Sequence, residues 1–461
     1  MKRTTYFVLA ALACLCVPQP ASGQTLKQPA SVRPVTTDTT YYYLEDEPSP
    51  SDVQQPVVED SKEFDFLGEC TSCGGVGGCD DCAGGWRLFP HAECCEPWTL
   101  LPPLPGGFTL TGWLDVGATA NADSPASRFN GPLAFNDQNE FQVNQLYAVL
   151  ERRANTGGSG WDWGARVDVL FGTDYVFNQM TGWETYQNGA NKWNAGPDYG
   201  LVTPQAYGEV AYNRLSMKVG RFYTIMGYEN TRAVNNFFYS HAYTMMYGEP
   251  FMHTGGLLTF EGDVWTLYGG LVNGWDQFDG LSDNLAFLAG ATYAPCHGAY
   301  TITGSIITGE EGVDLGGPYT PRTLYSLVFD WHVTDRVEYV LQHDLGWQEA
   351  VLANGESAEW YGINQYLYYT LNDCWRFGAR LEWFRDDDGF RVAGARAGNP
   401  FGGGLAGNYY AATLGANWIP SLNVIVRPEV RWDWFDGNGL PYDDGTSDDQ
   451  FTAAVDVILR F

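Results

Sequence analysis

From residue 107 to the C-terminus the sequence is a succession of short runs in which apolar and polar side chains alternate, each run bounded by Gly, Asn, Asp or Pro. A period of two residues is typical of β-strands whose two faces meet different surroundings. In the run that begins at Trp161, one face carries Trp163, Val167 and Val169, whereas Asp162 and Asp168 belong to the other. The pattern predicts an all-β chain with one apolar and one charged face on each strand.

About sixteen such runs can be counted, within a range of 14–18, and the connections between them alternate in length. Short turns are expected at residues 213–214, 261–263, 334–336, 372–374 and 420–421, and long loops at 121–139, 173–203, 223–250, 386–408 and 436–450. Short turns at one end and long loops at the other are typical of bacterial outer-membrane barrels, whereas a soluble β-sandwich has no reason to keep that alternation.

An even strand number places both chain ends on the short-turn side, which is the periplasmic side in such proteins. The sheet must also close, because an open edge would leave backbone groups unpaired in hydrocarbon. We therefore expect a transmembrane, antiparallel, up-and-down β-barrel at residues 107–461, with an aqueous lumen of the kind found in barrels of this size. No apolar stretch reaches the roughly 18 residues that a membrane-spanning helix needs.

The N-terminus has the pattern of a secretory signal. Lys2 and Arg3 precede an apolar run, and the small residues Ala21, Ser22 and Gly23 offer a cleavage site, so residues 1–23 are expected to be removed. Residues 24–106 lack periodicity and are rich in Pro, Ser, Asp and Gly, which predicts a mostly disordered periplasmic extension. The expected location of the mature protein is the outer membrane of a double-envelope bacterium.

A cysteine cluster lies in that extension, at Cys70, Cys73, Cys79 and Cys82. Two closely spaced Cys-x-x-Cys pairs can bring thiolates around a tetrahedral zinc ion. Only five residues separate the pairs, however, and an oxidising compartment favours disulfides or crosslinks between chains. Disulfides, metal binding and no specific role all stay open, and we expect no cofactor.

Charged side chains recur on the polar faces of the predicted strands. A midplane Arg or Lys facing lipid would cost roughly 2–4 kcal/mol, so these faces should point inward. Opposed basic and acidic walls could create a transverse field across the lumen, or the same charges could pair as struts that brace the wall. The predicted pore-lining residues are Arg166, Asp168, Lys218, Arg376, Arg380, Glu382, Arg427, Glu429, Arg431, Asp433, Asp456 and Arg460.

The final strand is predicted to run from Phe451 to Phe461, the last residue. A C-terminal aromatic residue after an alternating strand resembles the signal read by the barrel-assembly machinery of outer membranes. We therefore expect that machinery and outer-membrane lipids as partners, and a homo-oligomer, by analogy a trimer.

The formal charge of −30 argues against nucleic acid as a partner. The acid-rich loops predict a weak preference for cations, and one long loop, at residues 173–203 or 223–250, is expected to fold inward.

Residues 142–276 contain a series of short motifs in a characteristic order. This series is similar to that of the OmpL-like β-barrel porins, a family of double-envelope bacteria, and the similarity continues to Phe461. The motifs are Asn144-Gln145-Leu146-Tyr147, Arg166-Val167-Asp168-Val169-Leu170-Phe171-Gly172, Gly220-Arg221-Phe222, Gly227-Tyr228-Glu229, Tyr239-Ser240-His241, Gly248-Glu249-Pro250-Phe251, His253-Thr254-Gly255 and Asn273-Gly274-Trp275-Asp276. The resemblance implies a porin-like barrel, supplies no catalytic residues and says nothing about the cysteine-rich extension.

Together these features predict an outer-membrane porin for passive diffusion of small hydrophilic solutes or ions. The alternative is a surface-exposed structural or adhesive envelope protein on a barrel scaffold. An enzyme in barrel form, such as a phospholipase, is not expected, because it would need a Ser–His pair with a third orienting group. The adjacent residues Ser240 and His241 would tend to diverge in an extended chain.

Overall fold

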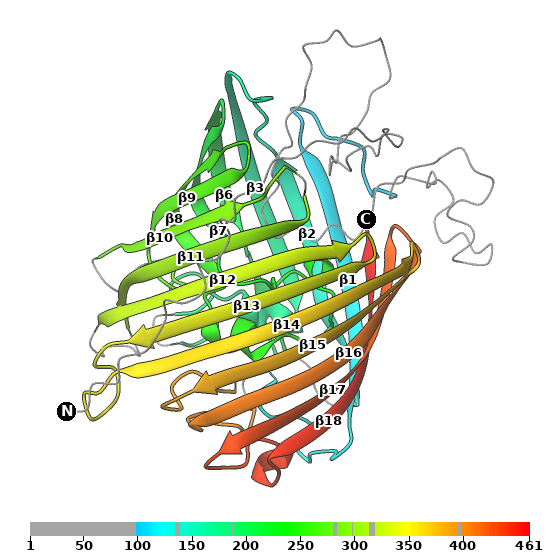
Figure 1. Ribbon diagram of the computed structural model, residues 1–461, viewed down its shortest axis with the longest axis vertical. Helices are drawn as coiled ribbons and strands as arrows, with labels where there is room; N and C mark the ends of the chain where they lie inside the picture. The colour runs from blue at the N-terminus through cyan, green and yellow to red at the C-terminus, as the bar shows by residue number, and fades with distance from the viewer. Residues whose placement is uncertain are drawn as a thin grey trace, which may run out of the picture. The chain divides into compact units, whose positions relative to one another are not determined.

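Sixteen antiparallel strands close into one barrel in the computed structural model (Figure 1). The structure describes residues 98–133, 139–186, 189–279, 284–296, 298–312, 319–394, 396 and 398–461. The barrel strands are β1 (Thr109–Asn121), β2 (Glu140–Arg152), β3 (Trp161–Gly172), β6 (Ala206–Tyr212), β7 (Leu215–Tyr223), β8 (Met252–Glu261), β9 (Trp265–Val272), β10 (Ala286–Tyr293), β11 (Tyr300–Glu311), β12 (Thr320–Thr334), β13 (Val337–Gln348), β14 (Ala358–Asn372), β15 (Trp375–Asp386), β16 (Gly407–Ser421), β17 (Val424–Gly437) and β18 (Asp449–Arg460). Two further strands, β4 (Asn194–Ala195) and β5 (Tyr199–Val202), form a small hairpin beside β3. The predicted barrel and its strand number are confirmed.

The barrel closes where the first and last strands meet. β1 pairs with β2 on one side and with β18 on the other, with Trp113 opposite Arg460 and Gly117 opposite Asp456. Phe461 completes the seam, because its backbone N–H donates to Gly112 O (2.9 Å) and its carbonyl accepts from Gly112 N (2.8 Å). No edge is left at this seam, as a lipid environment requires.

The two rims of the barrel differ in the length of their connections. At one rim the connections have eight residues or fewer: 153–160, 213–214, 262–264, 294–299, 335–336, 373–374 and 422–423. At the other rim they have eight or more, and we call them the long connections: 122–139, 173–205, 224–251, 273–285, 312–319, 349–357, 387–406 and 438–448. All the long connections leave the rim opposite the two ends of the barrel domain. In an outer-membrane barrel that rim faces the outside of the cell.

The two faces of the wall follow the predicted alternation. On β3, Trp161, Trp163 and Val167 are exposed on the outer face, whereas Arg166 and Asp168 are buried on the inner face. Across the whole barrel the exposed large side chains are mostly Leu, Val, Trp and Phe, and the buried polar ones come largely from the inner face. The outer face thus provides the apolar surface that lipid needs.

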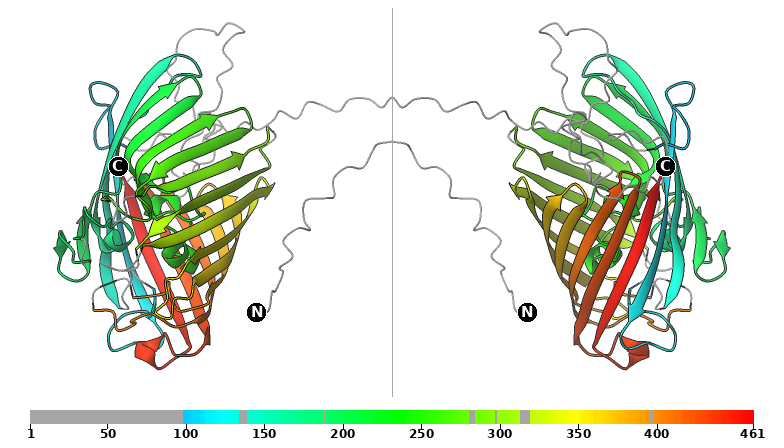
Figure 2. Two further views of the ribbon diagram at one scale, coloured as in Figure 1. Left: turned by 90° about the vertical axis from the view of Figure 1, so that its left-hand side faces the viewer. Right: turned by 90° about the vertical axis from the view of Figure 1, so that its right-hand side faces the viewer.

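The inner polar residues are buried because the connection between β7 and β8 enters the barrel. We call residues 224–251 the inner loop; it contains the short helices η2 (Ala233–Asn235) and η3 (Thr244–Gly248). The coils of this loop lie between the walls of the barrel in Figure 2. Two further short helices, η1 (Thr173–Phe177) and η4 (Asp443–Gly445), lie in other long connections. Among the described residues, no helix has the length and apolarity needed to cross a membrane.

Among the described residues, the barrel begins with β1 at Thr109. Trp98 N donates to Asn423 Oδ1 (2.7 Å), and Asn423 Nδ2 donates back to Trp98 O (2.8 Å), which fixes the approach to β1 against a short turn. In the barrel, Cys374 is disulfide-bonded, whereas Cys296 is an exposed free thiol. The predicted signal peptide and the cluster Cys70, Cys73, Cys79 and Cys82 lie outside the described residues.

Candidate functional site

The inner loop is the candidate site, because any solute that passes through the barrel must pass this loop. The sequence of the loop is unusual for a connection exposed to water, since Phe237, Phe238, Tyr239, Tyr243 and Met245 are all buried. Irregular backbone inside a barrel must also find partners for its N–H and C=O groups. The charged inner face of the wall supplies these partners.

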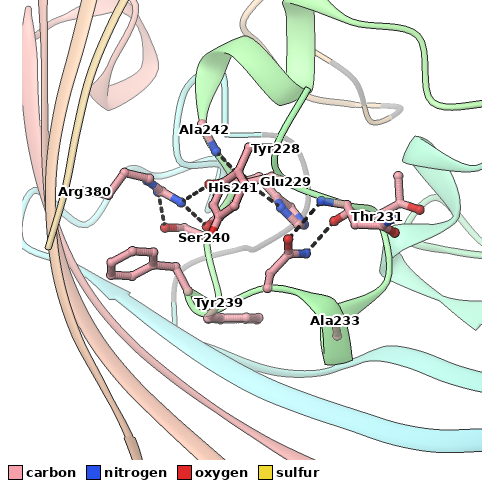
Figure 3. Close-up of polar contacts among 12 residues, drawn as sticks. Tyr228, Glu229, Thr231, Ala233, Tyr239, Ser240, His241, Ala242 and Arg380 are labelled. Atoms are coloured by element: carbon pink, nitrogen blue, oxygen red, sulfur yellow. Dashed lines mark hydrogen bonds and ion pairs between the residues drawn. The ribbon is translucent and has the colours of Figure 1, made fainter. Parts of the chain in front are cut away.

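Glu229 anchors the first half of the loop to β15 (Figure 3). Its carboxylate accepts hydrogen bonds from Arg380 Nη1 (2.8 Å), Tyr366 OH (3.1 Å) and the backbone N–H of Ala242 (2.9 Å). Burial would raise the pKa of Glu229, but Arg380 and His241 outweigh that effect and lower it to about 2. Glu229 is therefore a charged anchor throughout the physiological pH range.

Arginines of the wall bind carbonyl groups of the loop backbone. Arg380 Nη1 donates to Ser240 O (2.6 Å), and Arg431 Nη1 donates to His241 O (2.7 Å). Arg427 Nη1 donates to the carbonyls of Ala233 (2.9 Å) and Asn236 (2.7 Å). Hydrogen bonds from charged donors are stronger than neutral ones, so each guanidinium fixes a stretch of loop that has no regular structure of its own.

Acidic and amide side chains of the wall bind the N–H groups of the loop. Glu429 accepts from the N–H groups of Tyr239 (2.9 Å) and Ser240 (3.2 Å), and Glu382 accepts from Tyr243 N (2.8 Å). On the nearby strands β13 and β12, Gln342 Oε1 accepts from Tyr228 N (3.2 Å), and Ser326 Oγ accepts from Gly227 N (3.2 Å).

Gly227 lies where two parts of the inner loop pack closely together. Gly227 has φ +72°, and a Cβ there would overlap the Glu249 carboxylate, so only glycine fits.

The loop also reaches the opposite wall, at β2. Gln145 Nε2 donates to Thr231 O (2.7 Å), and Gln145 Oε1 accepts from Ala233 N (3.0 Å). Tyr239 OH donates to Asn144 Oδ1 (3.2 Å), and its ring lies against Gly117 of β1. The inner loop is therefore bonded to strands on several sides of the lumen, and it spans the lumen instead of lining one wall.

Two carboxyl groups from other connections support the attachment of the inner loop. Asp276, in the connection after β9, accepts from the N–H groups of Phe251 (3.0 Å) and Met252 (2.8 Å), where the loop rejoins the wall. Burial raises the pKa of Asp276 to about 7. Asp174, in η1, accepts from Gln145 Nε2 (2.7 Å), and burial raises its pKa to about 6.

A second layer covers the loop at the rim with the long connections. Tyr247 OH donates to Ala393 O (2.6 Å), and Arg391 Nε donates to Tyr247 O (2.7 Å). The Arg391 guanidinium lies over the rings of Trp275 and Trp360, at 5.1 Å from each centroid. Burial, followed by the neighbouring Arg322, lowers the pKa of Arg391 to about 9. Tyr247 and Arg391 thus attach the inner loop to the connection between β15 and β16, at the rim with the long connections.

All twelve residues predicted to line the pore fall on the inner face of the strands, but they do not all face open space. Nine are buried: Arg166, Asp168, Arg380, Glu382, Arg427, Glu429, Arg431, Asp433 and Asp456. The other three, Lys218, Arg376 and Arg460, are half-buried, and they lie toward the rim with the short turns. The wall charges also pair with each other, as in Arg427–Asp456, Arg431–Asp433 and Arg166–Asp168.

Of the two roles considered for these charges, bracing the wall is visible in these pairs. A third role, bonding to the inner loop, was not anticipated. The missed anchors Glu229, Gln145 and Gln342 carry no spacing signal in the sequence. The aromatic and Met-rich composition of residues 237–247 is the feature that could have identified the loop as buried.

Ser240 and His241 are both buried at this site. Ser240 Oγ accepts from Arg380 Nη2 (2.9 Å) and Arg431 Nη1 (3.4 Å), and His241 Nδ1 lies 3.3 Å from Glu229 Oε2. These contacts use the hydroxyl and the imidazole to hold the loop. In the described part of the chain, no group of three His, Cys, Asp or Glu side chains is arranged to hold a metal ion.

A protein-family model described as "Putative beta-barrel porin-2, OmpL-like" matches residues 107–461. The search of curated proteins finds no match. Three similar solved structures are an anion-selective porin of Comamonas acidovorans (10% identity, TM-score 0.51, covering 77% of this chain and 99% of that one), OmpT of Vibrio cholerae (11%, 0.49, 78% and 99%) and the outer-membrane channel DcaP of Acinetobacter baumannii (13%, 0.48, 77% and 97%). At such identities the likeness extends to the barrel fold alone.

Proposed function

The chain belongs to the OmpL-like family of β-barrel porins of the outer membrane, and from that premise we propose a channel narrowed by its inner loop. The single observation that carries this proposal is the set of bonds from the loop to β2, β13, β15 and β17 inside a closed barrel. A 16-stranded barrel without such a loop would leave a wide aqueous lumen. The permeant class that we propose is therefore small hydrophilic solutes or ions.

Single-channel conductance in a planar lipid bilayer tests this function. The full chain is compared with a variant in which a short Gly-Ser linker replaces residues 225–250. The matched control has residues 350–356 shortened, which belong to another long connection that is largely exposed. We expect small, stable conductance for the full chain and the control, and a several-fold increase for the first variant. A full chain that never opens a stable pore would instead favour a structural or adhesive role.

We propose a weak preference for cations. Residues 107–461 contain 41 Asp and Glu but only 19 Lys and Arg. Inside the barrel many charges are paired or bonded to the loop, whereas Asp444 and Asp448 are exposed and Asp443 is half-buried in a long connection. The rim therefore contributes most of the uncompensated negative potential. A reversal potential of the opposite sign in a salt gradient would contradict this.

We also propose that the protein is not an enzyme. A serine nucleophile needs a free hydroxyl beside a base, but two guanidinium groups already bond the hydroxyl of Ser240. Assays of lipid and ester hydrolysis should give no rate above the background. A rate that the Ser240→Ala substitution abolishes would overturn this proposal.

Assembly forms the last part of the proposal. We expect Phe461 to act as the recognition signal for the barrel-assembly machinery, supported by its position at the seam with Gly112. Phe461→Ala should lower the amount of protein in the outer membrane more than Phe451→Ala, a change at the start of the same strand. A homo-trimer is proposed by analogy with other porins, and mass measurement of the detergent-solubilised protein tests it.

A further inference from the structure

A second long connection folds to the outside of the barrel wall. Residues 178–203, which we call the outer segment, follow η1, and the β4–β5 hairpin projects beside the barrel in Figure 2. β5 extends the sheet next to β3, with Leu201 opposite Phe171 and Val202 opposite Leu170. The outer segment is therefore attached to the wall by backbone pairing at this edge.

A buried ion pair holds the outer segment against β7. Arg221 lies opposite Ala206 in the register, on the same face as the exposed residues Val219 and Met217, so it belongs to the outer face of the wall. Its guanidinium bonds Glu184 Oε1 (2.5 Å) and Asn178 O (2.9 Å), and both charged side chains are almost completely buried.

The ion pair explains how the wall tolerates a charge on its outer face. An arginine here would be costly if it faced lipid. The outer segment removes that cost by covering Arg221 with polar groups of its own.

The exposed side of the outer segment is aromatic. Trp183 and Trp193 pack edge to face with centroids 5.9 Å apart, and Phe278, from the connection after β9, lies 4.6 Å from Trp183. Tyr186 is 56% exposed, and Lys192 lies over its ring at 4.9 Å. We call Trp183, Tyr186, Trp193, Leu201 and Phe278 the aromatic patch; each is at least 36% exposed.

The aromatic patch continues the surface of the barrel that faces lipid. Leu201 stands beside Phe171 on the outer face of the sheet, and Phe171 stacks on Tyr199 with centroids 5.9 Å apart. Along β3 the same face carries Val169 and Val167, both exposed. The apolar outer face of β3 is thus continued by Leu201 of the outer segment.

We propose that the aromatic patch is a binding surface for the outer leaflet of the membrane, at the level where acyl chains meet anionic headgroups. Trp and Tyr favour this zone because they combine an apolar ring with a polar group. Lys192 adds a cation beside the rings, suited to a headgroup phosphate. The outer segment then acts as a lateral membrane anchor, a role separate from conduction.

Site-specific photocrosslinking tests this proposal. The full chain carries p-benzoylphenylalanine in place of Trp193, is assembled in the outer membrane and is then irradiated. Matched controls carry the same group in place of Leu381, on the outer face of β15, or Leu440, in the connection between β17 and β18; both are more exposed than Trp193, so access of the probe does not limit them. We expect lipid adducts at position 193 as at position 381, and none at position 440.

Two other results would overturn the proposal. Crosslinks between two copies of the chain at position 193 would make the patch an interface between subunits, and an absence of lipid adducts, as at position 440, would place it in water. Quenching of tryptophan fluorescence by lipids with brominated acyl chains is a second measurement that leaves the fold intact. Trp193→Leu should lower the quenched fraction, and an unchanged fraction would count against membrane contact.

Discussion

The inner loop and the outer segment leave the same rim of the barrel but fold to opposite sides of the wall. Each is held by a buried pair between a wall arginine and a glutamate of the connection, namely Arg380–Glu229 inside and Arg221–Glu184 outside. The face on which the arginine falls differs: Arg380 is on the inner face of β15, and Arg221 is on the outer face of β7. The direction of each connection thus follows from the strand face that carries the charge.

The two connections also differ in how many anchors they have. Inside, Arg427, Arg431 and Glu429 bind the backbone of the loop in addition to the Arg380–Glu229 pair. Outside, the Arg221–Glu184 pair is the charged contact between the outer segment and the wall, and Asp198 of the segment also pairs with Arg396 of another connection. Removing one anchor should therefore loosen the inner loop only locally but release the part of the outer segment around Glu184.

The largest expected effect on conduction comes from Arg380→Ala. Breaking a buried ion pair by removing one partner costs roughly 3–5 kcal/mol, because the remaining charge is left unpaired. Glu229 and Glu382 would both lose a partner, so the middle of the inner loop should fluctuate and the single-channel current should become larger and noisier. Bilayer recording measures this change.

Two controls distinguish the anchor from a general loss of stability. Arg336→Ala, in an exposed short turn, should leave the current unchanged. Glu229→Gln combined with Arg380→Ala should be less disruptive than the sum of the single changes, because the two groups interact directly. A current identical to wild type in Arg380→Ala would mean that the loop does not limit conduction.

A smaller effect, limited to the protease sensitivity of the outer segment, is expected for Arg221→Ala. Glu184 would remain without its cation, and the outer segment should lift from the wall to return that carboxylate to water. Lys192 would then become accessible, so limited trypsin digestion should cut the segment there while the conductance stays constant. Glu184→Gln is the matched variant and should be cut more slowly, because the amide oxygen can still accept a hydrogen bond. Equal resistance in all three proteins would contradict a role for this ion pair.

A pH effect of intermediate size is expected at Asp276, where the inner loop rejoins β8. Burial raises its pKa to about 7 in the folded arrangement, whereas a carboxyl group released to water would ionise near pH 4. Between these two pKa values, Asp276 is protonated while the inner loop is attached to the wall and ionised when the loop is released. Raising the pH up to about 7 therefore destabilises the attached state of the inner loop. Channel openings should therefore become more frequent from pH 5 to pH 8.

The Asp276→Asn variant isolates this contribution. The amide keeps an oxygen acceptor for the N–H groups of Phe251 and Met252 but has no proton to lose across this range. Asp174, with a pKa of about 6, changes in the same direction, so Asp174→Asn should remove a separate, smaller part of the pH dependence. Glu229, with a pKa of about 2, stays charged and contributes no change between pH 5 and pH 8. A wild-type opening frequency independent of pH would refute this assignment.

The strands were predictable because each one repeats the same alternation of apolar and polar side chains. Trp161, Val167 and Val169 alternate with Arg166 and Asp168, and a membrane on one side and polar surroundings on the other keep that contrast over the whole barrel. The alternation also determines which side chains point inward. For this reason the positions of the strands and their faces agree with the sequence pattern.

The bonds between side chains of the inner face and the inner loop were less predictable, because the two groups in each bond come from distant parts of the chain. Arg427 and Ala233 are 194 residues apart, and nothing near either residue indicates that one binds the carbonyl of the other. The sequence did suggest two loops that could fold inward, and residues 223–250 do so. The other loop divides: η1 turns inward, where Phe177 packs on His241 and Phe251. Residues that follow η1 cover Arg221, a charge on the otherwise apolar face of Met217 and Val219, which requires a polar cover outside the barrel.

The smallest expected effect concerns charge at the rim. Asp448 is exposed and Asp443 is half-buried in the connection before β18, where solvent screens their charges over about 10 Å at 0.1 M salt. Asp443→Asn with Asp448→Asn should therefore reduce the reversal potential in a dilute salt gradient only slightly, and not at all near 1 M salt. Asp330→Asn, a half-buried inner-face change near the opposite rim, is the comparison. If it shifts the reversal potential more than the rim pair does, selectivity is set inside the lumen beside the inner loop, and the acidic rim serves mainly solubility.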